Sequence, residues 1–204
     1  RTIPDGRADV AFVSPIASLT YEMEAHPRGL RWLAMPLSDV EGWKRYLQVR
    51  RTAIPTTIEY GVSSAIGVES IGSAFLYISR PDQDQEMIYQ LAKWFHTAFD
   101  SYKDVHAIAP RMHVDLFRRY LNHNPLPVSD GTVRYLREIG KWTDDDDVWN
   151  KEAVENMDKW VAGRNAALEE ARANNVRVHF RGEEYIALLE KHTDELPKFR
   201  VRVE

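Results

Sequence analysis

The sequence of 204 residues contains no cysteine. This absence excludes disulfide bonds, thiol nucleophiles and thiolate metal sites, because each of them requires the cysteine sulfur. It does not identify the compartment, since exported proteins can also lack cysteine. The compartment therefore has to be inferred from other features.

Long apolar runs and extended basic clusters are absent as well. No stretch approaches the roughly 20 apolar residues of a membrane-spanning helix. The formal net charge is -4, and the basic clusters are short, as at Arg50-Arg51 and Arg118-Arg119. Nucleic-acid binding depends on clustered Lys and Arg that release counterions from phosphate groups. This charge pattern argues against nucleic acid as a partner. The length of 204 residues fits one large domain or two small lobes.

The patterns of common catalytic and metal sites are also missing. The histidines show no His-Glu-x-x-His spacing, and Ser14 and Ser18 lack the glycines of a nucleophile elbow. Asp144 to Asp147 lack the alternation and glycine of a calcium loop, whereas acidic residues favour the first turn of a helix. We therefore expect no catalytic residues, no metal site and no cofactor. A hydrolase ranks behind the two binding functions considered below.

The first part of the chain has the pattern of an α/β protein. Apolar runs at 10–13 and 30–37 predict strands, and each is followed by a polar helix start, at Ser14-Pro15 and at Ser38-Asp39. Alternating residues from 50 to 80 predict further strands, including a nearly continuous apolar one at 71–78. Alternation of strands and helices is typical of an open α/β sheet.

The remainder of the chain has mostly helical periodicity, with apolar residues spaced by three and four. One short alternating run predicts a strand at 176–180, after a break at Asn174-Asn175. The predicted helices cover 84–102, 114–121, 130–140, 144–171 and 183–191.

The junction Val13-Ser14-Pro15-Ile16 is the strongest candidate for a binding site. A strand that ends where a helix begins presents unpaired backbone amides and the positive end of the helix dipole. Such a junction suits a carboxylate or another small anion. The competing interpretation is a plain helix cap, in which Ser14 only completes the first turn.

Three segments carry a family resemblance. They are Asp5-Gly6-Arg7-Ala8-Asp9-Val10-Ala11-Phe12, Thr52-Ala53-Ile54-Pro55 with Tyr60, and Pro127-Val128-Ser129-Asp130-Gly131-Thr132-Val133-Arg134-Tyr135-Leu136-Arg137-Glu138-Ile139-Gly140. Together they resemble the extracytoplasmic receptors of tripartite ATP-independent periplasmic (TRAP) transporters, in the TRAP-associated extracytoplasmic immunogenic (TAXI) branch. Ser129-Asp130, Thr132 and Leu136 depart from the His-Pro, alanine and second tyrosine of the family pattern.

The resemblance implies an α/β fold of the type II periplasmic-binding-protein kind, with two lobes that close over a ligand. It also implies that the chain is incomplete at its N-terminus, because family members begin with a leader and a glycine-rich lobe. The regions expected are a second lobe at about 1–55, crossing strands at about 56–80, a return to the first lobe at about 81–142, and an acidic helical extension at 143–204.

The function implied is that of a bacterial solute-binding receptor, periplasmic or otherwise extracytoplasmic. It would capture a small organic anion, such as a dicarboxylate or an acidic amino acid, and deliver it to the membrane permease of a TRAP transporter. Val13, Ser14 and Ile16 are expected to contact the ligand through backbone amides, and Tyr60 through its ring and hydroxyl. An unpaired sheet edge also leaves a homodimer open.

The segment from Asp130 to Gly140 is expected to be scaffold and not ligand site. Tyr135 and Ile139 would pack inward, Arg134 would pair with Glu138 four residues later, and Gly140 would end the helix.

The rival hypothesis is a ligand-sensing or protein-interaction domain of the same fold. In it, the helix from Trp149 to Ala171 is a docking surface, whereas the simpler interpretation packs that helix on the parent domain.

Overall fold

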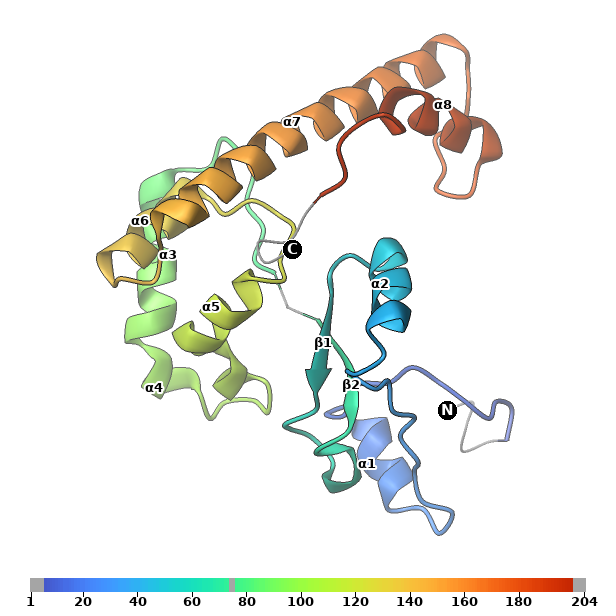
Figure 1. Cartoon of the computed structure of the whole chain (residues 1–204), viewed down its shortest axis with the longest axis vertical. Coiled ribbons are helices and arrows are strands. Elements are labelled where there is room, and N and C mark those ends of the chain that lie inside the picture. The colour runs from blue at the N-terminus through green and yellow to red at the C-terminus, as the bar shows by residue number, and fades with distance from the viewer. Residues whose placement is uncertain (1–5, 74–75, 200–204) are drawn as a thin grey trace. The chain divides into compact units, whose positions relative to one another are not determined.

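A computed structural model describes residues 6–73 and 76–199. The described part is rich in helices and contains a small two-stranded sheet (Figure 1). None of its helices combines the length and the apolar character needed to cross a membrane. In chain order the elements are α1 (Ser18–Glu24), α2 (Val40–Val49), β1 (Ala53–Thr57), the 3-10 helix η1 (Ser63–Ala65), β2 (Glu69–Ser73), α3 (Gln85–Thr97), α4 (Phe99–Tyr102), the 3-10 helix η2 (Ala109–Met112), α5 (Val114–Leu121), α6 (Asp130–Glu138), α7 (Asp144–Ala173) and α8 (Glu183–Thr193).

The chain forms two compact units, and one of the boundaries between them falls inside α3. Unit 1 comprises Arg1–Ser79 and Lys93–His123. Unit 2 comprises Arg80–Ala92 and Asn124–Glu204.

Unit 1 is built around an antiparallel pair of strands, in which Pro55 of β1 lies opposite Ile71 of β2. A proline is tolerated in a two-stranded sheet because the missing amide can face the unpaired edge. Next to the sheet lies a small apolar core. Its buried members are Ile58, Val62 and Ala65, and Trp32 and Val68 pack against them.

The predicted strands before β1 are wrong. Residues 10–13 form no strand, and the Phe12 side chain is 78% exposed. Residues 30–37 form none either, although the Met35 amide donates a 2.8 Å hydrogen bond to the Glu69 carbonyl at the start of β2. A strand requires a hydrogen-bonded neighbour as well as an apolar pattern. In the described residues, β1 and β2 pair only with each other.

Two later strand predictions also need correction. β2 ends at Ser73, residues 76–80 form no strand, and residues 74–75 of the predicted run lie outside the described residues, as does Asp5 of the first resembling segment. Residues 176–180 form no strand.

The predicted helices are confirmed, with shifted ends. The Asp39 side chain caps α2 by accepting a 2.9 Å hydrogen bond from the Gly42 amide. The helix expected at 84–102 is divided at Ala98 into α3 and α4. The acidic run at 144–147 begins α7, whose capping box joins Thr143 and Asp146.

In unit 2, α8 lies beside the C-terminal part of α7 (Figure 1). Small residues on α7 allow this approach, since Ala167 and Ala171 are completely buried. A β-carbon on Gly163 would lie 2.7 Å from the His192 carbonyl oxygen. Glu170 on α7 then binds Lys191 at 2.7 Å and His192 at 2.7 Å.

Candidate functional site

The predicted junction has a different local structure from the one expected. α1 has only 7 residues and begins at Ser18, so its N-cap is Ala17 and not Ser14. The Ser14 carbonyl accepts hydrogen bonds from the Ala17 amide at 3.1 Å and from the Thr20 hydroxyl at 2.7 Å. The prediction that Ser14 caps this helix is therefore wrong, because a tight turn at Pro15 and Ile16 precedes it.

The structure nevertheless brings the two segments with predicted ligand contacts together. The Val62 amide donates a 2.9 Å hydrogen bond to the Pro15 carbonyl. Gly61 lies beside this contact with a φ of 102°, and a β-carbon there would be 2.4 Å from the Pro15 oxygen. Both the backbone angle and the close approach require glycine. This contact between Pro15 and Gly61-Val62 holds the Val13 to Ile16 segment next to the loop that begins with Tyr60.

Tyr60 belongs to a cluster of charged and aromatic side chains in unit 1, the shared-carboxylate cluster. It consists of Glu59, Tyr60, Arg111, Arg119 and Tyr120. Arg111 Nη1 lies 2.9 Å from Glu59 Oε2, and Arg119 Nη2 lies 3.6 Å from the same oxygen. Arg111 Nη2 also donates a 3.2 Å hydrogen bond to the Tyr120 hydroxyl. Two guanidinium groups thus share one carboxylate.

Aromatic rings complete the surroundings of both arginines. The Arg111 guanidinium carbon lies 4.9 Å from the centre of the Tyr60 ring, and that of Arg119 lies 5.6 Å from the centre of the Tyr120 ring. Such contacts stabilise a cation over a ring face. The side chain of Arg111 is 21% exposed, whereas Arg119 is 54% and Glu59 is 48% exposed. The cluster is therefore anchored at Arg111 and open to solvent at Arg119 and Glu59.

The environment keeps Tyr60 and Arg111 protonated. Burial, and secondarily the nearby Tyr120, raises the pKa of Tyr60, although the Arg111 charge opposes this rise. Burial works against the charge of Arg111, but hydrogen bonds to Tyr120 and Glu59 outweigh it and raise the Arg111 pKa. Tyr60 thus remains a neutral phenol and Arg111 a cation at neutral pH, which suits an anionic ligand.

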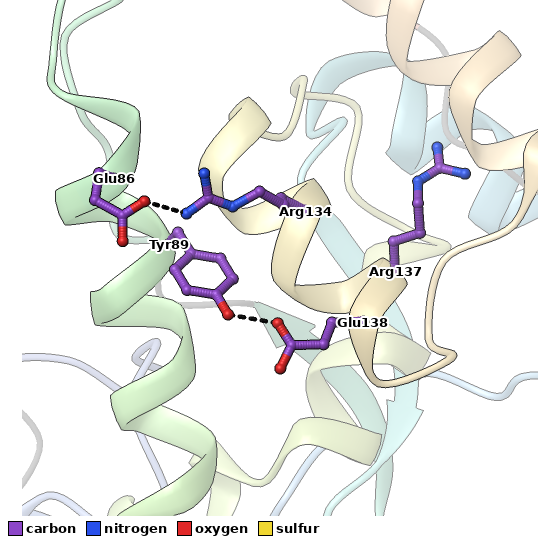
Figure 2. Close-up of a pocket in the computed structure, with 5 residues that line it drawn as sticks. All are labelled: Glu86, Tyr89, Arg134, Arg137 and Glu138. Atoms are coloured by element: carbon purple, nitrogen blue, oxygen red, sulfur yellow. Dashed lines mark hydrogen bonds and ion pairs between the residues drawn. The ribbon is translucent and has the colours of Figure 1, made fainter.

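Unit 2 contains a second candidate, the α3–α6 pocket, with a volume of about 480 Å³. Figure 2 shows Glu86 and Tyr89 on α3 facing Arg134 and Glu138 on α6, with Arg137 at the edge. Arg134 pairs with Glu86 and lies 3.9 Å from the centre of the Tyr89 ring. The Tyr89 hydroxyl donates to Glu138.

The charges of the α3–α6 pocket are matched within the protein. Arg134 pairs with Glu86 across two helices, so its predicted pairing with Glu138 is wrong. Arg137 pairs with Asp147 of α7. Each arginine therefore has a carboxylate of its own.

Packing explains the rest of α6. The prediction of an inward Tyr135 is confirmed, since it is 3% exposed, and Ile139 is half-buried. Gly140 has a φ of 68° and follows the end of the helix as expected. A β-carbon on Gly131 would lie 2.4 Å from the Gln85 carbonyl oxygen, so this glycine allows α6 to approach α3.

Sequence reasoning missed most of the shared-carboxylate cluster. Of its five members only Tyr60 was a predicted ligand contact, and Arg119 appeared only as half of a short basic pair. Glu59 and Arg111 are brought together by tertiary packing, which leaves no local spacing to detect. Among the described residues, no group of three or more His, Asp or Glu side chains is placed to hold a metal ion.

Comparison with known proteins gives one finding. The model of the NMT1-like family matches residues 2–140, which include β1, β2 and α6 as well as the whole shared-carboxylate cluster. No curated protein and no solved structure matches the chain. The family model matches more than half of the chain. The chain therefore belongs to the NMT1-like family, a family of periplasmic-binding-like proteins.

Proposed function

We propose that this chain is an extracytoplasmic solute-binding receptor, or part of one, that captures a small organic anion for a TRAP-type secondary transporter. The observation that carries the proposal is the NMT1-like match over residues 2–140. The finer assignment to the TAXI branch rests on the resembling segments that end at Gly140. The ligand would be a dicarboxylate or an acidic amino acid, and the partner a membrane permease.

The proposed architecture is that of a type II periplasmic-binding protein with two lobes. Residues from 1 to about 55 would belong to the second lobe, about 56–80 to the crossing strands, and about 81–142 to the first lobe. Residues 143–204 would form an extension beyond the family region. The family match to residue 140 supports this last boundary, because α7 begins only four residues later, at Asp144.

The proposed ligand contacts remain Val13, Ser14, Ile16 and Tyr60. The hydrogen bond between Val62 and Pro15 supports this set, because it holds both segments together. The turn before α1 changes the expected chemistry, since the backbone there has no long helix behind it. Tyr60 thereby becomes the stronger candidate, because its phenol is half-buried and a neighbouring arginine covers its ring.

Isothermal titration of the purified protein against a panel of carboxylates tests this function. The panel contains succinate, glutarate, L-glutamate and L-aspartate, with succinamide as the uncharged control. We expect saturable heat with at least one acid and none with succinamide. The absence of heat with every acid would contradict the receptor function.

Tyr60→Phe tests the site itself. It keeps the ring under Arg111 and removes only the hydroxyl, so we expect the affinity for the best acid to fall about tenfold. Tyr46→Phe is the matched control, because Tyr46 lies on α2 and packs edge-on against Trp43. Equal affinities for the two variants would remove Tyr60 from the site.

The rival function is a ligand-sensing or protein-interaction domain, and one observation favours it. The family match ends at residue 140, whereas the longest described helix, α7, lies beyond it and exposes Val148, Val154 and Val161. A cut at Thr143 would be a poor test, because Asn150 on α7 bonds both the amide and the carbonyl of Val128. Both bonds hold Val128, which lies within the family region, so the cut would also disturb that region.

Removal of residues 160–204 is the sharper test of the rival. It keeps Asn150 and Asp147, and it removes α8 together with the part of α7 that packs on it. A folded, monomeric remainder that still binds an acid would support an appended interaction element. Aggregation of the remainder would indicate that α8 and the end of α7 are needed for packing of the protein.

A further inference from the structure

The shared-carboxylate cluster contains more positive charge than its own carboxylate can balance. Glu59 Oε2 is the partner of both Arg111 and Arg119. The Asp115 carboxylate, on the same helix as Arg119, lies 3.6 Å from Nδ1 of the N-cap residue His113. A guanidinium group can bind a carboxylate through two parallel hydrogen bonds, and two guanidinium groups on one oxygen leave much of this capacity unused.

The exposure of the three charged groups shows which of them can exchange partners. Arg111 is mostly buried and is fixed by Tyr120 and by the Tyr60 ring. Glu59 is 48% exposed, and its carboxylate is the only ion-pair partner of Arg111 among the described residues. A half-exposed ion pair contributes little net stability. Solvent can therefore compete for Glu59 far more easily than for Arg111.

We propose that Glu59 occupies the position of a ligand carboxylate, and that Arg111 and Arg119 bind the carboxylate of a small organic acid when Glu59 swings away. The protein's own carboxylate shows which chemistry fits between the two cations. Tyr60 and Tyr120 lie against the guanidinium groups and add phenol hydroxyls to the cluster. This inference deepens the proposed function and rests on it for the assignment of the site to a transported solute.

Glu59 then also sets the affinity of the site. The ligand has to displace an internal competitor, so binding is weaker than two arginines alone would give. Removal of the competing charge should strengthen binding, which is the opposite of what loss of a direct ligand contact would do. This reversed sign distinguishes a displaced carboxylate from an ordinary binding residue.

Glu59→Gln tests the proposal, with succinate as the probe. The change keeps the size of the side chain and removes its charge, and we expect the affinity for succinate to rise about tenfold. Glu41→Gln is the matched control, because Glu41 pairs with Lys44 on the surface of α2 and should leave the affinity unchanged. Urea unfolding of both variants verifies that each remains folded.

NMR of the arginine side chains locates the binding and separates this proposal from the function. We expect succinate to shift the Nε–H signals of Arg111 and Arg119, at lower concentration in Glu59→Gln than in the unchanged protein. Unshifted signals in both proteins would overturn the proposal. The function would still stand if titration detected an acid bound elsewhere.

Two further outcomes would also overturn the proposal. One is an affinity for succinate that falls in Glu59→Gln, which would make Glu59 a supporting residue. The other is a shift of the arginine signals by inorganic phosphate with none by succinate, which would assign the cluster to a different anion.

Discussion

The two units each contain a cluster of arginine, tyrosine and glutamate, but the charges are distributed differently. In the α3–α6 pocket, Arg134 pairs with Glu86 and Arg137 with Asp147. In the shared-carboxylate cluster, Arg111 and Arg119 both depend on Glu59. Residue types alone therefore do not distinguish the two, because the same side chains serve in both places.

The difference suggests how a cluster that only joins two helices can be distinguished from one that binds a ligand in this protein. A cluster whose cations each have a carboxylate has little to gain from an external anion. A cluster with a shared carboxylate retains attraction for one, at a place where solvent reaches it. The pocket of Figure 2 is a concavity of about 480 Å³ whose arginines are already paired, whereas the cluster in unit 1 has the chemistry suited to a ligand.

Gly131→Ala should have the largest effect, and it tests the close packing of α6 on α3. The new methyl group would lie 2.4 Å from the Gln85 carbonyl oxygen and 2.8 Å from the Tyr89 amide nitrogen, both of them backbone atoms that cannot easily move. We expect the free energy of unfolding to fall by about 2–3 kcal/mol, measured by urea denaturation.

Gly140→Ala provides the control for this change. Gly140 has a φ of 68°, but a β-carbon there would meet no atom within 4 Å, so only backbone strain opposes alanine. We expect a loss of about 1 kcal/mol. A loss at position 131 no greater than that at 140 would show that α6 can retreat from α3.

Arg119→Gln and Arg134→Gln test the comparison directly, because these side chains are 54% and 52% exposed. Each change should lower the free energy of unfolding by less than about 1 kcal/mol, as is usual for exposed ion pairs. Only Arg119→Gln should weaken succinate binding, by about three- to tenfold. Equal binding losses in titration of both variants would erase the distinction between the clusters.

Acid should affect unit 1 before unit 2. Burial lowers the pKa of His123, so the unfolded chain takes up its proton more readily and stability falls as the pH drops through its ordinary value of 6.5. Hydrogen bonds from Lys191 and His192 lower the pKa of Glu170, whose contribution is present above its ordinary value of 4.5 and is lost only as the pH falls further.

Urea midpoints at pH 7.5, 5.5 and 3.5 measure this order. His123→Gln should reduce the decrease between pH 7.5 and 5.5, and Glu170→Gln should reduce the decrease below 5.5. A decrease between 7.5 and 5.5 that is unchanged in His123→Gln would assign it to another group. The expected shifts are small, because both side chains keep considerable contact with solvent.

Helices were predictable in this chain because their signals are local. The cap at Asp39, the acidic start of α7 and the break at Asn174-Asn175 can each be identified within a few residues, and all three appear in the structure. The strands expected before β1 were not, because the apolar runs at 10–13 and 30–37 do not show whether a neighbour is available for pairing. The alternation between residues 50 and 80 did predict strands in the region where β1 and β2 lie. In the described residues, only β1 and β2 form a hydrogen-bonded pair of strands.

The candidate site was predictable to a smaller degree. Tyr60 was predicted as a ligand contact through a family resemblance, and its loop lies beside the turn at Pro15. Arg111 was not predicted, because its ion pair with Glu59 depends on the tertiary packing of η2 against the loop after β1. The sequence contains both residues but not the distance between them.

The length of α7 gives unit 2 a lever arm. Its 30 residues rise by 1.5 Å each, so the helix is about 45 Å long. Near one end, Asp147 and Asn150 tie it to Trp142 and Val128, and near the other it carries α8. A tilt of about 5° at the Thr143 cap would displace the far end by about 4 Å. A small adjustment in the family region would therefore be amplified into a displacement as large as the width of a side chain.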